Sequence, residues 1–204
     1  MSEPAEVADG VVAAIHSGDL AGLRQLLADH PGLASAPLGA RYGTRTPMHA
    51  VTDWPGYFPN GPETVRILVE AGADLNTPDG SIGTPLANAV GYGCWDVARL
   101  LVARGANVDQ PWIAASLGLL DRLQQLLGDR PPPEQVSQAF WPHACSGGQR
   151  RAAEYLLVRG ADPNWVPDYA KGTPLDAATG QGTQRDNLIG WLRSHGARPE
   201  EPDA

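Results

Sequence analysis

The side chains best suited to acid–base chemistry in this chain are two histidines and two aspartates, His49, Asp53, His143 and Asp168. A histidine and a carboxylate can transfer protons together if one group orients the other and the imidazole pKa lies near neutrality. His49 and Asp53 are four residues apart, so on one helix they would face the same way. If the protein is an enzyme, we expect its catalytic residues to be His49, Asp53 and His143. Apolar walls would come from Trp54, Tyr92 and Trp112.

Other motifs for catalysis or cofactor binding are absent from the sequence. It contains no nucleophile elbow, P-loop or dinucleotide fingerprint, and its glycine runs at 91–93 and 147–148 follow small-residue segments rather than strands. The five histidines lie far apart, without the C-x-x-C or H-E-x-x-H spacing of metal sites. We therefore expect no metal and no cofactor, and we favour binding over catalysis.

Composition and charge exclude several classes of protein. Of the 204 residues, 42% are apolar and 19% are charged, which is typical of a folded globular chain. The net charge is −8 and the 15 basic residues are scattered, whereas a nucleic-acid-binding surface needs a basic patch. All but one of these basic residues are arginines, which we interpret as the codon bias of a GC-rich, bacterial genome. The sequence thus predicts no nucleic-acid partner.

No segment of the sequence predicts export or membrane insertion. Residues 1–10 are acidic and lack the basic and apolar regions of a signal peptide. No apolar run approaches the roughly 20 residues of a membrane-spanning helix. Two cysteines, Cys94 and Cys145, are too few for a disulfide framework and fit a reducing compartment. We therefore expect a cytoplasmic protein with no membrane partner.

An internal repeat is the strongest pattern in the chain. Four glycines preceded by small residues are each followed, eight positions later, by a leucine and a second apolar residue: Gly18, Gly93, Gly118 and Gly148. This pattern indicates a short helix, a glycine turn and a second helix with one apolar stripe. Because no single unit can bury its stripe alone, neighbouring units must stack.

The repeat defines the expected fold class and domain organisation. We expect an all-α solenoid of about six helix-turn-helix units in a single domain, residues 7–199. The approximate units are 7–43, 44–79, 80–109, 110–133, 134–164 and 165–199. Residues 1–6 and 200–204 are expected to form flexible ends.

Three units open with a shared motif, seen at Thr46-Pro47-Met48-His49, Thr84-Pro85-Leu86 and Thr173-Pro174-Leu175. Together with AGADLN at 71–76, RGANVD at 104–109 and RGADPN at 159–164, this motif resembles the ankyrin repeat over about residues 7–198. The resemblance implies an ankyrin-repeat solenoid, some of whose units carry short β-hairpin fingers, and a protein partner. It also implies a structural role for His49, whose ring nitrogens would bridge backbone groups of neighbouring units.

Five extra residues separate the two helices of the second unit, in the segment 53–61. Prolines and glycines restrict the backbone of this segment, which carries the aromatic residues Trp54, Tyr57 and Phe58. These side chains can pack over the adjacent helix ends, or they can contact a ligand, since Trp and Tyr are enriched at binding hot spots. Both interpretations remain open.

The finger between the third and fourth units is shorter than the others. Four residues separate Gly105 from Asp109, whereas twelve separate Gly72 from Thr84. We therefore predict that this β-hairpin finger is deleted. Trp112 either fills the resulting notch or lines the entry to a ligand site.

The fifth unit lacks the usual opening motif and carries Trp141 and His143 instead. Trp141 aligns with Leu86, a core position, so we expect it to be buried. His143 aligns with Asn88, and its ring is equally compatible with a packed and a ligand-facing position.

Our leading hypothesis is a binding or scaffold module that presents a concave surface to a protein partner. The expected contact residues are Trp54, Tyr57, Phe58, Tyr92, Trp112 and Trp165. The alternative is a small-molecule-binding or catalytic pocket at the missing finger near Trp112, closed by the aromatic loop 54–59. Its polar groups would be His49, Asp53 and His143.

Overall fold

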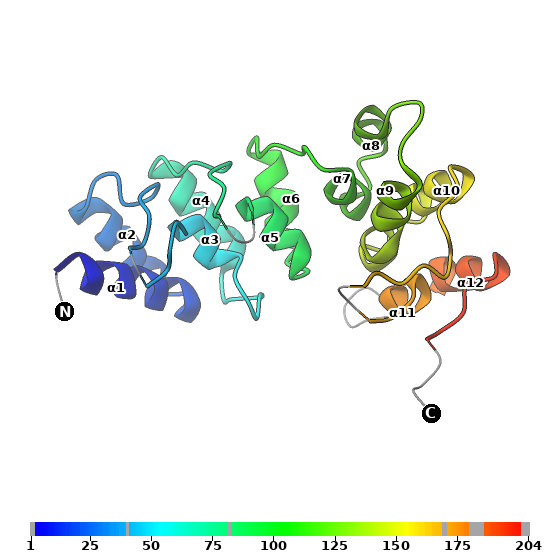
Figure 1. Cartoon of the computed structure of the whole chain (residues 1–204). Helices are drawn as coiled ribbons and strands as arrows, with labels where there is room; N and C mark the ends of the chain where they lie inside the picture. The colour runs from blue at the N-terminus through cyan, green and yellow to red at the C-terminus, as the bar shows by residue number, and fades with distance from the viewer. Residues whose placement is uncertain (1–2, 40, 81–82, 169–170, 180–185, 201–204) are drawn as a thin grey trace. The chain divides into compact units, whose positions relative to one another are not determined.

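The computed structural model describes residues 3–39, 41–80, 83–168, 171–179 and 186–200 (Figure 1). The chain divides into two compact units, Met1–Asn107 and Val108–Ala204, and the internal structure of each is described separately. From here on, "first unit" and "second unit" mean these two parts of the chain and not single repeats. The expected flexible ends at 1–2 and 201–204 lie outside the described residues. The first helix begins at Glu3, so residues 3–6, which we expected to be flexible, are helical.

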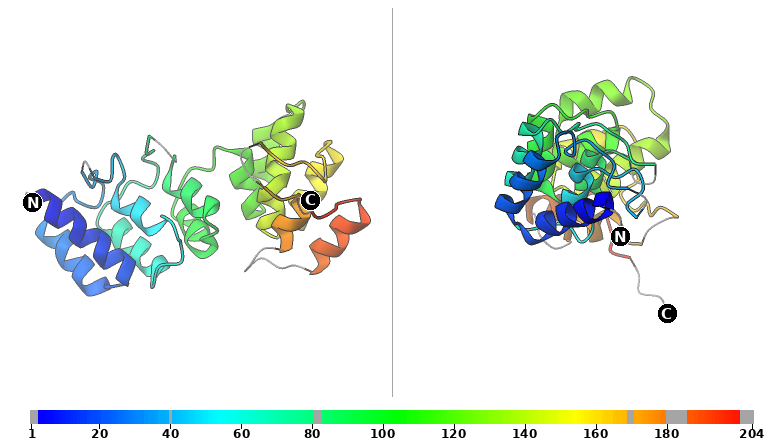
Figure 2. Two further views of the ribbon diagram at one scale, coloured as in Figure 1. Left: turned by 60° about the horizontal axis from the view of Figure 1, so that its bottom comes forward. Right: turned by 90° about the vertical axis from the view of Figure 1, so that its left-hand side faces the viewer.

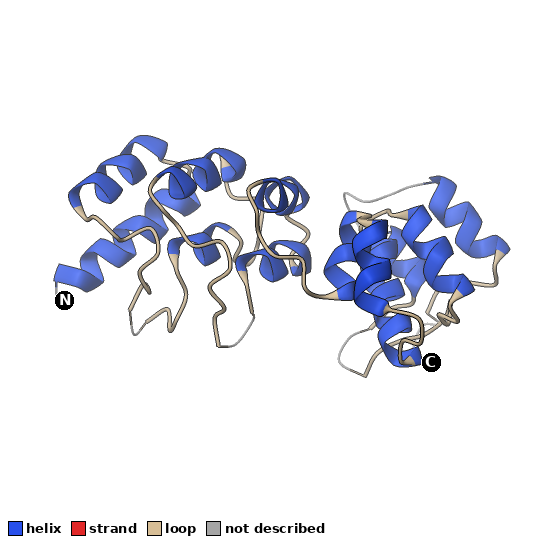
Figure 3. Ribbon diagram, turned by 90° about the horizontal axis from the view of Figure 1, so that it is seen from above, coloured by secondary structure: helices blue, strands red, loops and turns tan. Residues whose placement is uncertain are grey.

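The described part of the first unit contains three helix pairs. They are α1 (Glu3–Ser17) with α2 (Leu20–Asp29), α3 (Pro47–Val51) with α4 (Gly61–Glu70), and α5 (Pro85–Gly91) with α6 (Trp95–Ala103). The first helices of the pairs pack in one row, α1–α3–α5, and the second helices pack in another, α2–α4–α6 (Figures 2 and 3). This arrangement is the two-row stack of a helical repeat.

Local sequence signals explain where these helices begin and turn. Thr84 caps α5 by accepting a hydrogen bond from the backbone of Ala87 at 3.2 Å, and Pro85 occupies the first helical position, where its missing N–H costs little. The turn between α5 and α6 needs the left-handed conformation that Gly93 adopts, with φ of 72°. One face of α6 then buries Leu101 against its neighbours.

The second unit is built on the same plan with an altered middle pair. Its helices are α7 (Pro111–Leu117), α8 (Leu120–Leu127), α9 (Pro133–Gln138), the π-helical segment η1 (Ala139–Ala144), α10 (Arg150–Val158), α11 (Pro174–Thr179) and α12 (Asp186–Ser194). The segment η1 packs between α7 and α11, and α10 packs against α8. The first-row position of the middle pair is thus taken by η1, which follows α9 without a break.

Trp141 marks a kink inside η1. Its backbone is extended, with φ of −96° and ψ of 141°, as expected for a residue that precedes a proline. The side chain is buried, as its alignment with Leu86 predicts, and its indole N–H donates to the carbonyl of Gly172 at 2.6 Å. Trp141 therefore fastens η1 to the loop that leads into α11.

The expected all-α class agrees with the described residues, in which the finger segments form no strand. The segment ahead of α5 contains one isolated antiparallel bridge, between Asp79 and Gly83. Across the described ranges, no helix combines the length and hydropathy that a bilayer span requires.

His49 joins α3 to the loop ahead of α5. The backbone N–H of Thr46 donates to Nδ1 of His49 at 3.1 Å, and Nε2 lies 3.1 Å from the carbonyl oxygen of Gly83. Because a backbone N–H can only donate, Nδ1 carries no proton, and Nε2 carries the proton that it donates to Gly83. Burial of the ring lowers the pKa of His49 and so favours this neutral form. His49 therefore bridges neighbouring backbone segments, as the resemblance implies.

We expect His49→Ala to lower the free energy of unfolding by about 2–4 kcal/mol, because it leaves a cavity, removes a partner of the buried Thr46 backbone N–H and removes one of the two donors to the Gly83 carbonyl. Urea unfolding monitored by circular dichroism measures this loss. The control is His30→Ala, at a half-buried histidine that follows α2. Equal losses in the two variants would contradict the bridging role.

Candidate functional site

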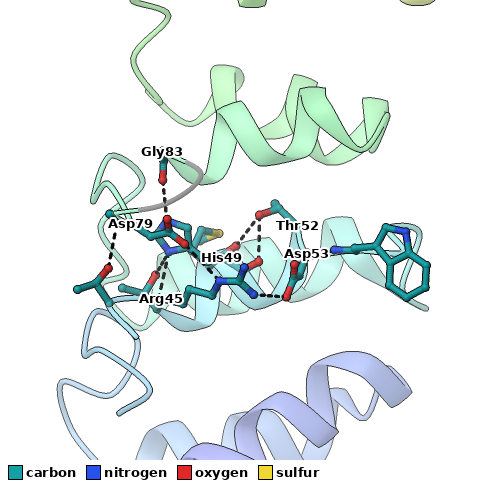
Figure 4. A network of polar contacts seen from close by, with 11 residues as sticks. Arg45, His49, Thr52, Asp53, Asp79 and Gly83 are labelled. Carbon is teal, nitrogen blue, oxygen red and sulfur yellow. Dashed lines mark hydrogen bonds and ion pairs between the residues drawn. The ribbon is translucent and has the colours of Figure 1, made fainter. Parts of the chain in front are cut away.

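Arg45, which directly precedes the cap of α3, organises a network of charges with Asp53 after the helix and Asp79 in the following loop (Figure 4). One guanidinium nitrogen lies 2.6 Å from Asp53, and Nε lies 3.2 Å from the buried carboxylate of Asp79. The other Asp53 oxygen accepts a hydrogen bond from the backbone of Trp54 at 2.8 Å. Arg45 and the backbone of Trp54 thus hold both oxygens of Asp53, so Asp53 supports the start of the inserted segment.

Residues 53–60, the anchored loop, touch the turns of both neighbouring helix pairs in the first unit. On one side, Phe58 stacks on His16 with ring centroids 4.0 Å apart, and the amide of Asn60 donates to the carbonyl of Gly18 at 2.9 Å. On the other side, the hydroxyl of Tyr57 donates to the carbonyl of Gly93. The insertion is therefore held at both of its flanks.

Close packing against Cys94 holds the middle of the anchored loop. Gly56 has a φ of 75°, and a Cβ added to it would lie 2.9 Å from the sulfur of Cys94. Cys94 is buried, which raises the pKa of its thiol despite a smaller opposite effect of the Tyr57 backbone N–H. The thiol is therefore an uncharged packing surface for the loop at neutral pH.

The structure places the three aromatic residues of the loop in different environments. Trp54 and Tyr57 are 72% and 68% exposed, whereas Phe58 is half-buried. Phe58 thus packs against its neighbours, which is the first of the two roles considered for these residues. Trp54 and Tyr57 are exposed and can contact a ligand. The loop combines a fixed backbone with two solvent-facing aromatic side chains.

Trp95 extends this aromatic surface, although the sequence analysis did not select it. A Cβ added to Gly93 would lie 3.2 Å from the Tyr57 hydroxyl and 3.7 Å from the indole nitrogen of Trp95, so both polar atoms approach one point. Trp95 opens α6 two residues after the turn glycine, where the equivalent positions are Leu20, Leu120 and Arg150. The tryptophan at this position, which no other of these repeats shares, is the signal that could have identified it. Tyr92, which was selected, is half-buried at the end of α5.

The predicted contact residues of the second unit form two aromatic pairs. Trp112 packs against His143 with ring centroids 4.6 Å apart and the two planes tilted by 38°, and Trp165 meets the buried Trp141 edge-on at 6.2 Å. Burial lowers the pKa of His143 to about 3, so the imidazole is neutral at physiological pH. His143 is therefore a packed aromatic ring rather than an acid poised near neutrality.

The groups required by the pocket hypothesis belong to different units. His49 and Asp53 lie in the first unit, and Trp112 and His143 lie in the second. Within the first unit, Asp53 pairs with Arg45 and His49 bonds to Thr46 and Gly83, so each is engaged in a structural contact. The catalytic alternative stays a prediction.

Two surface hollows are large enough for a small ligand, but neither lies at the site that the pocket hypothesis predicts. One, of about 610 Å³, is formed in the second unit by Gly118, Leu119, Leu120, Asp121, Arg122 and Arg151. Another, of about 470 Å³, is formed in the first unit by residues 7–8, 30–33 and 36–37. Neither is lined by a residue that the sequence analysis selected as a contact or catalytic residue. The described residues contain no group of three or more His, Cys, Asp or Glu side chains that could hold a metal ion.

Comparison with known proteins supports a repeat of the ankyrin type. Residues 83–112, which hold α5, α6 and the start of α7, match the family model of the ankyrin repeat. The serine/threonine-protein kinase VIK of Arabidopsis thaliana is 37% identical over 90 residues, which are 44% of this chain and 19% of the kinase. The chain thus corresponds to about a fifth of that relative's length.

We expect Gly56→Ala to lower the free energy of unfolding by about 1–3 kcal/mol more than Gly32→Ala, as measured by urea unfolding. Both glycines have positive φ, 75° and 90°, so backbone strain affects both variants. Only the methyl group at position 56 meets the sulfur of Cys94, because the space around Gly32 is open. Similar losses in the two variants would contradict the close packing of the loop on Cys94.

We expect His143 to make the stability of the chain depend on acid pH. Between pH 3 and 6.5 the unfolded state binds more protons at this residue than the folded state, so stability is complete above pH 6.5 and falls as the pH decreases. At pH 5 the loss due to His143 is about 2 kcal/mol, from about 1.4 kcal/mol per pH unit. Urea midpoints at pH 7.5 and pH 5 measure it, and His143→Gln should reduce the difference between them by that amount. An unchanged difference in the variant would contradict the neutral state of the His143 imidazole in the folded chain.

Proposed function

We propose that this chain is a protein-binding module, a cytoplasmic array of six ankyrin-type helix pairs over residues 7–199. The family match at 83–112 supports the repeat type, and the helix pairs of the two units support the extension of the pattern beyond that segment. Ankyrin repeats generally mediate contacts between proteins, which supports a scaffold role.

The observation that carries this proposal is the exposure of Trp54 and Tyr57 on a loop whose backbone is fixed. Large aromatic side chains are usually buried when their packing serves stability, and exposed apolar surface of this kind marks interaction sites. Trp and Tyr are also enriched among the residues that dominate binding energy. Since the anchored loop is already ordered by contacts with His16, Gly18 and Gly93, binding would require little further ordering.

The test is affinity capture from a lysate of the source organism, with proteins and small molecules both identified by native mass spectrometry. We expect a stoichiometric protein partner whose affinity falls about 30-fold or more in Trp54→Ala, the loss typical of a binding hot spot. Val158→Ala is the matched control, because Val158 is an exposed apolar residue in the second unit.

The two other outcomes of this experiment are also informative. A protein partner that binds Trp54→Ala as tightly as the unmodified chain would overturn the assignment of the site. A retained small molecule without a protein partner would overturn the scaffold role and support the ligand pocket. Unfolding measurements on Trp54→Ala exclude a trivial loss of structure, because its exposed side chain contributes little to stability.

A further inference from the structure

An exposed carboxylate adjoins the aromatic residues at the turn between α5 and α6. Asp96 follows Trp95 in the first turn of α6, and its side chain is 88% exposed. Trp95 lies close to Tyr57, because its indole nitrogen and the Tyr57 hydroxyl both approach the turn at Gly93. Partial burial raises the pKa of Tyr57, and the negative charge of Asp96 contributes to the same rise. Tyr57, Trp95 and Asp96 therefore form one surface, which we call the acidic aromatic patch.

Asp96 is available to an incoming cation despite its neighbour Arg99. The two side chains approach to 3.5 Å, three residues apart on α6, and that of Arg99 is also largely exposed. Ion pairs of this kind contribute little in water, because solvent and salt screen them. A cation of the partner can therefore bind the Asp96 carboxylate, because breaking the ion pair with Arg99 costs little free energy.

The remaining groups of the patch also suit a positive charge. The Tyr57 hydroxyl donates its hydrogen to the carbonyl of Gly93, so toward any other partner the phenol oxygen can act only as a hydrogen-bond acceptor. The rings of Tyr57 and Trp95 have electron-rich faces that attract cations. The chain as a whole has a net charge of −8, which favours a basic partner over an acidic one.

We propose that the acidic aromatic patch binds an arginine side chain of the partner protein. A guanidinium is planar, stacks on aromatic rings and donates two parallel hydrogen bonds to one carboxylate, whereas a lysine ammonium is a strongly hydrated point charge. Arginine is therefore the cation that can use the rings and Asp96 together. This inference rests on the proposed function, since it names the chemistry of the protein partner at the same surface.

The test uses the full chain with ¹⁵N-labelled tryptophan and three synthetic heptapeptides of glycine and serine that carry two arginines, two lysines or two citrullines. Citrulline keeps the shape of arginine without its charge. We expect the arginine peptide to shift the indole N–H resonance of Trp95 saturably, and we expect no shift with the citrulline peptide. The lysine peptide should bind about threefold or more weakly than the arginine peptide. Trp95→Phe identifies the resonance.

A matched pair of variants separates a local site from general attraction to an acidic chain. Asp96→Asn should weaken binding of the arginine peptide about fivefold or more. Asp121→Asn removes the same charge at the equivalent position of α8, three residues after its turn glycine, and should leave the affinity within about twofold. Equal losses in the two variants, equal shifts with the citrulline peptide, equal affinity for lysine, or an unmoved Trp95 resonance would each overturn the proposal.

The captured partner distinguishes this proposal from the proposed function. If Trp54→Ala loses the partner and Asp96→Asn keeps it at full affinity, the binding function stands and the arginine contact is wrong. If neither variant changes the affinity, the surface itself has been misassigned.

Discussion

The hydrogen bonds of His49 hold the central helix pair of the first unit to the segment that follows it. Short helices such as α3 are too small to be stable alone, so their geometry depends on tertiary contacts. A neutral imidazole with one accepting and one donating nitrogen satisfies the backbone of Thr46 and of Gly83 in a buried position. Near this bridge, Arg45 joins Asp53 and Asp79, so the end of α3 is fixed where the inserted loop begins.

The same position in the next helix pair carries Ala87, which has no ring to form such a bridge. The first helix of that pair, α5, still begins with a threonine cap and a proline. The first compact unit ends soon after this pair, at Asn107. The sequence also lacks eight residues of finger between Gly105 and Asp109, compared with the segment between Gly72 and Thr84. The third helix pair therefore lacks the histidine ring, and the segment after it lacks the finger whose carbonyl would accept a hydrogen bond from that ring.

The anchored loop shows how an insertion becomes a rigid surface. Gly56 allows the backbone to approach Cys94, while Tyr57, Phe58 and Asn60 attach to the turns of the adjacent pairs. These contacts are made by the Tyr57 hydroxyl, the Asn60 amide and the Phe58 ring. Trp54 and the ring of Tyr57 are therefore left exposed to solvent. A helical-repeat scaffold can in this way present a local binding surface without a flexible segment.

The sequence by itself determined the helical class, the glycine turns, the helix starts at Pro47 and Pro85, and the burial of Trp141. These features depend on spacing and local backbone preference, which a linear pattern contains. Tertiary structure alone decided that Phe58 packs while Trp54 is exposed, that Trp95 lies beside Tyr57, and that His143 packs against Trp112. Those outcomes depend on which distant residues face one another across a turn, and aromatic residues of one type can serve either environment.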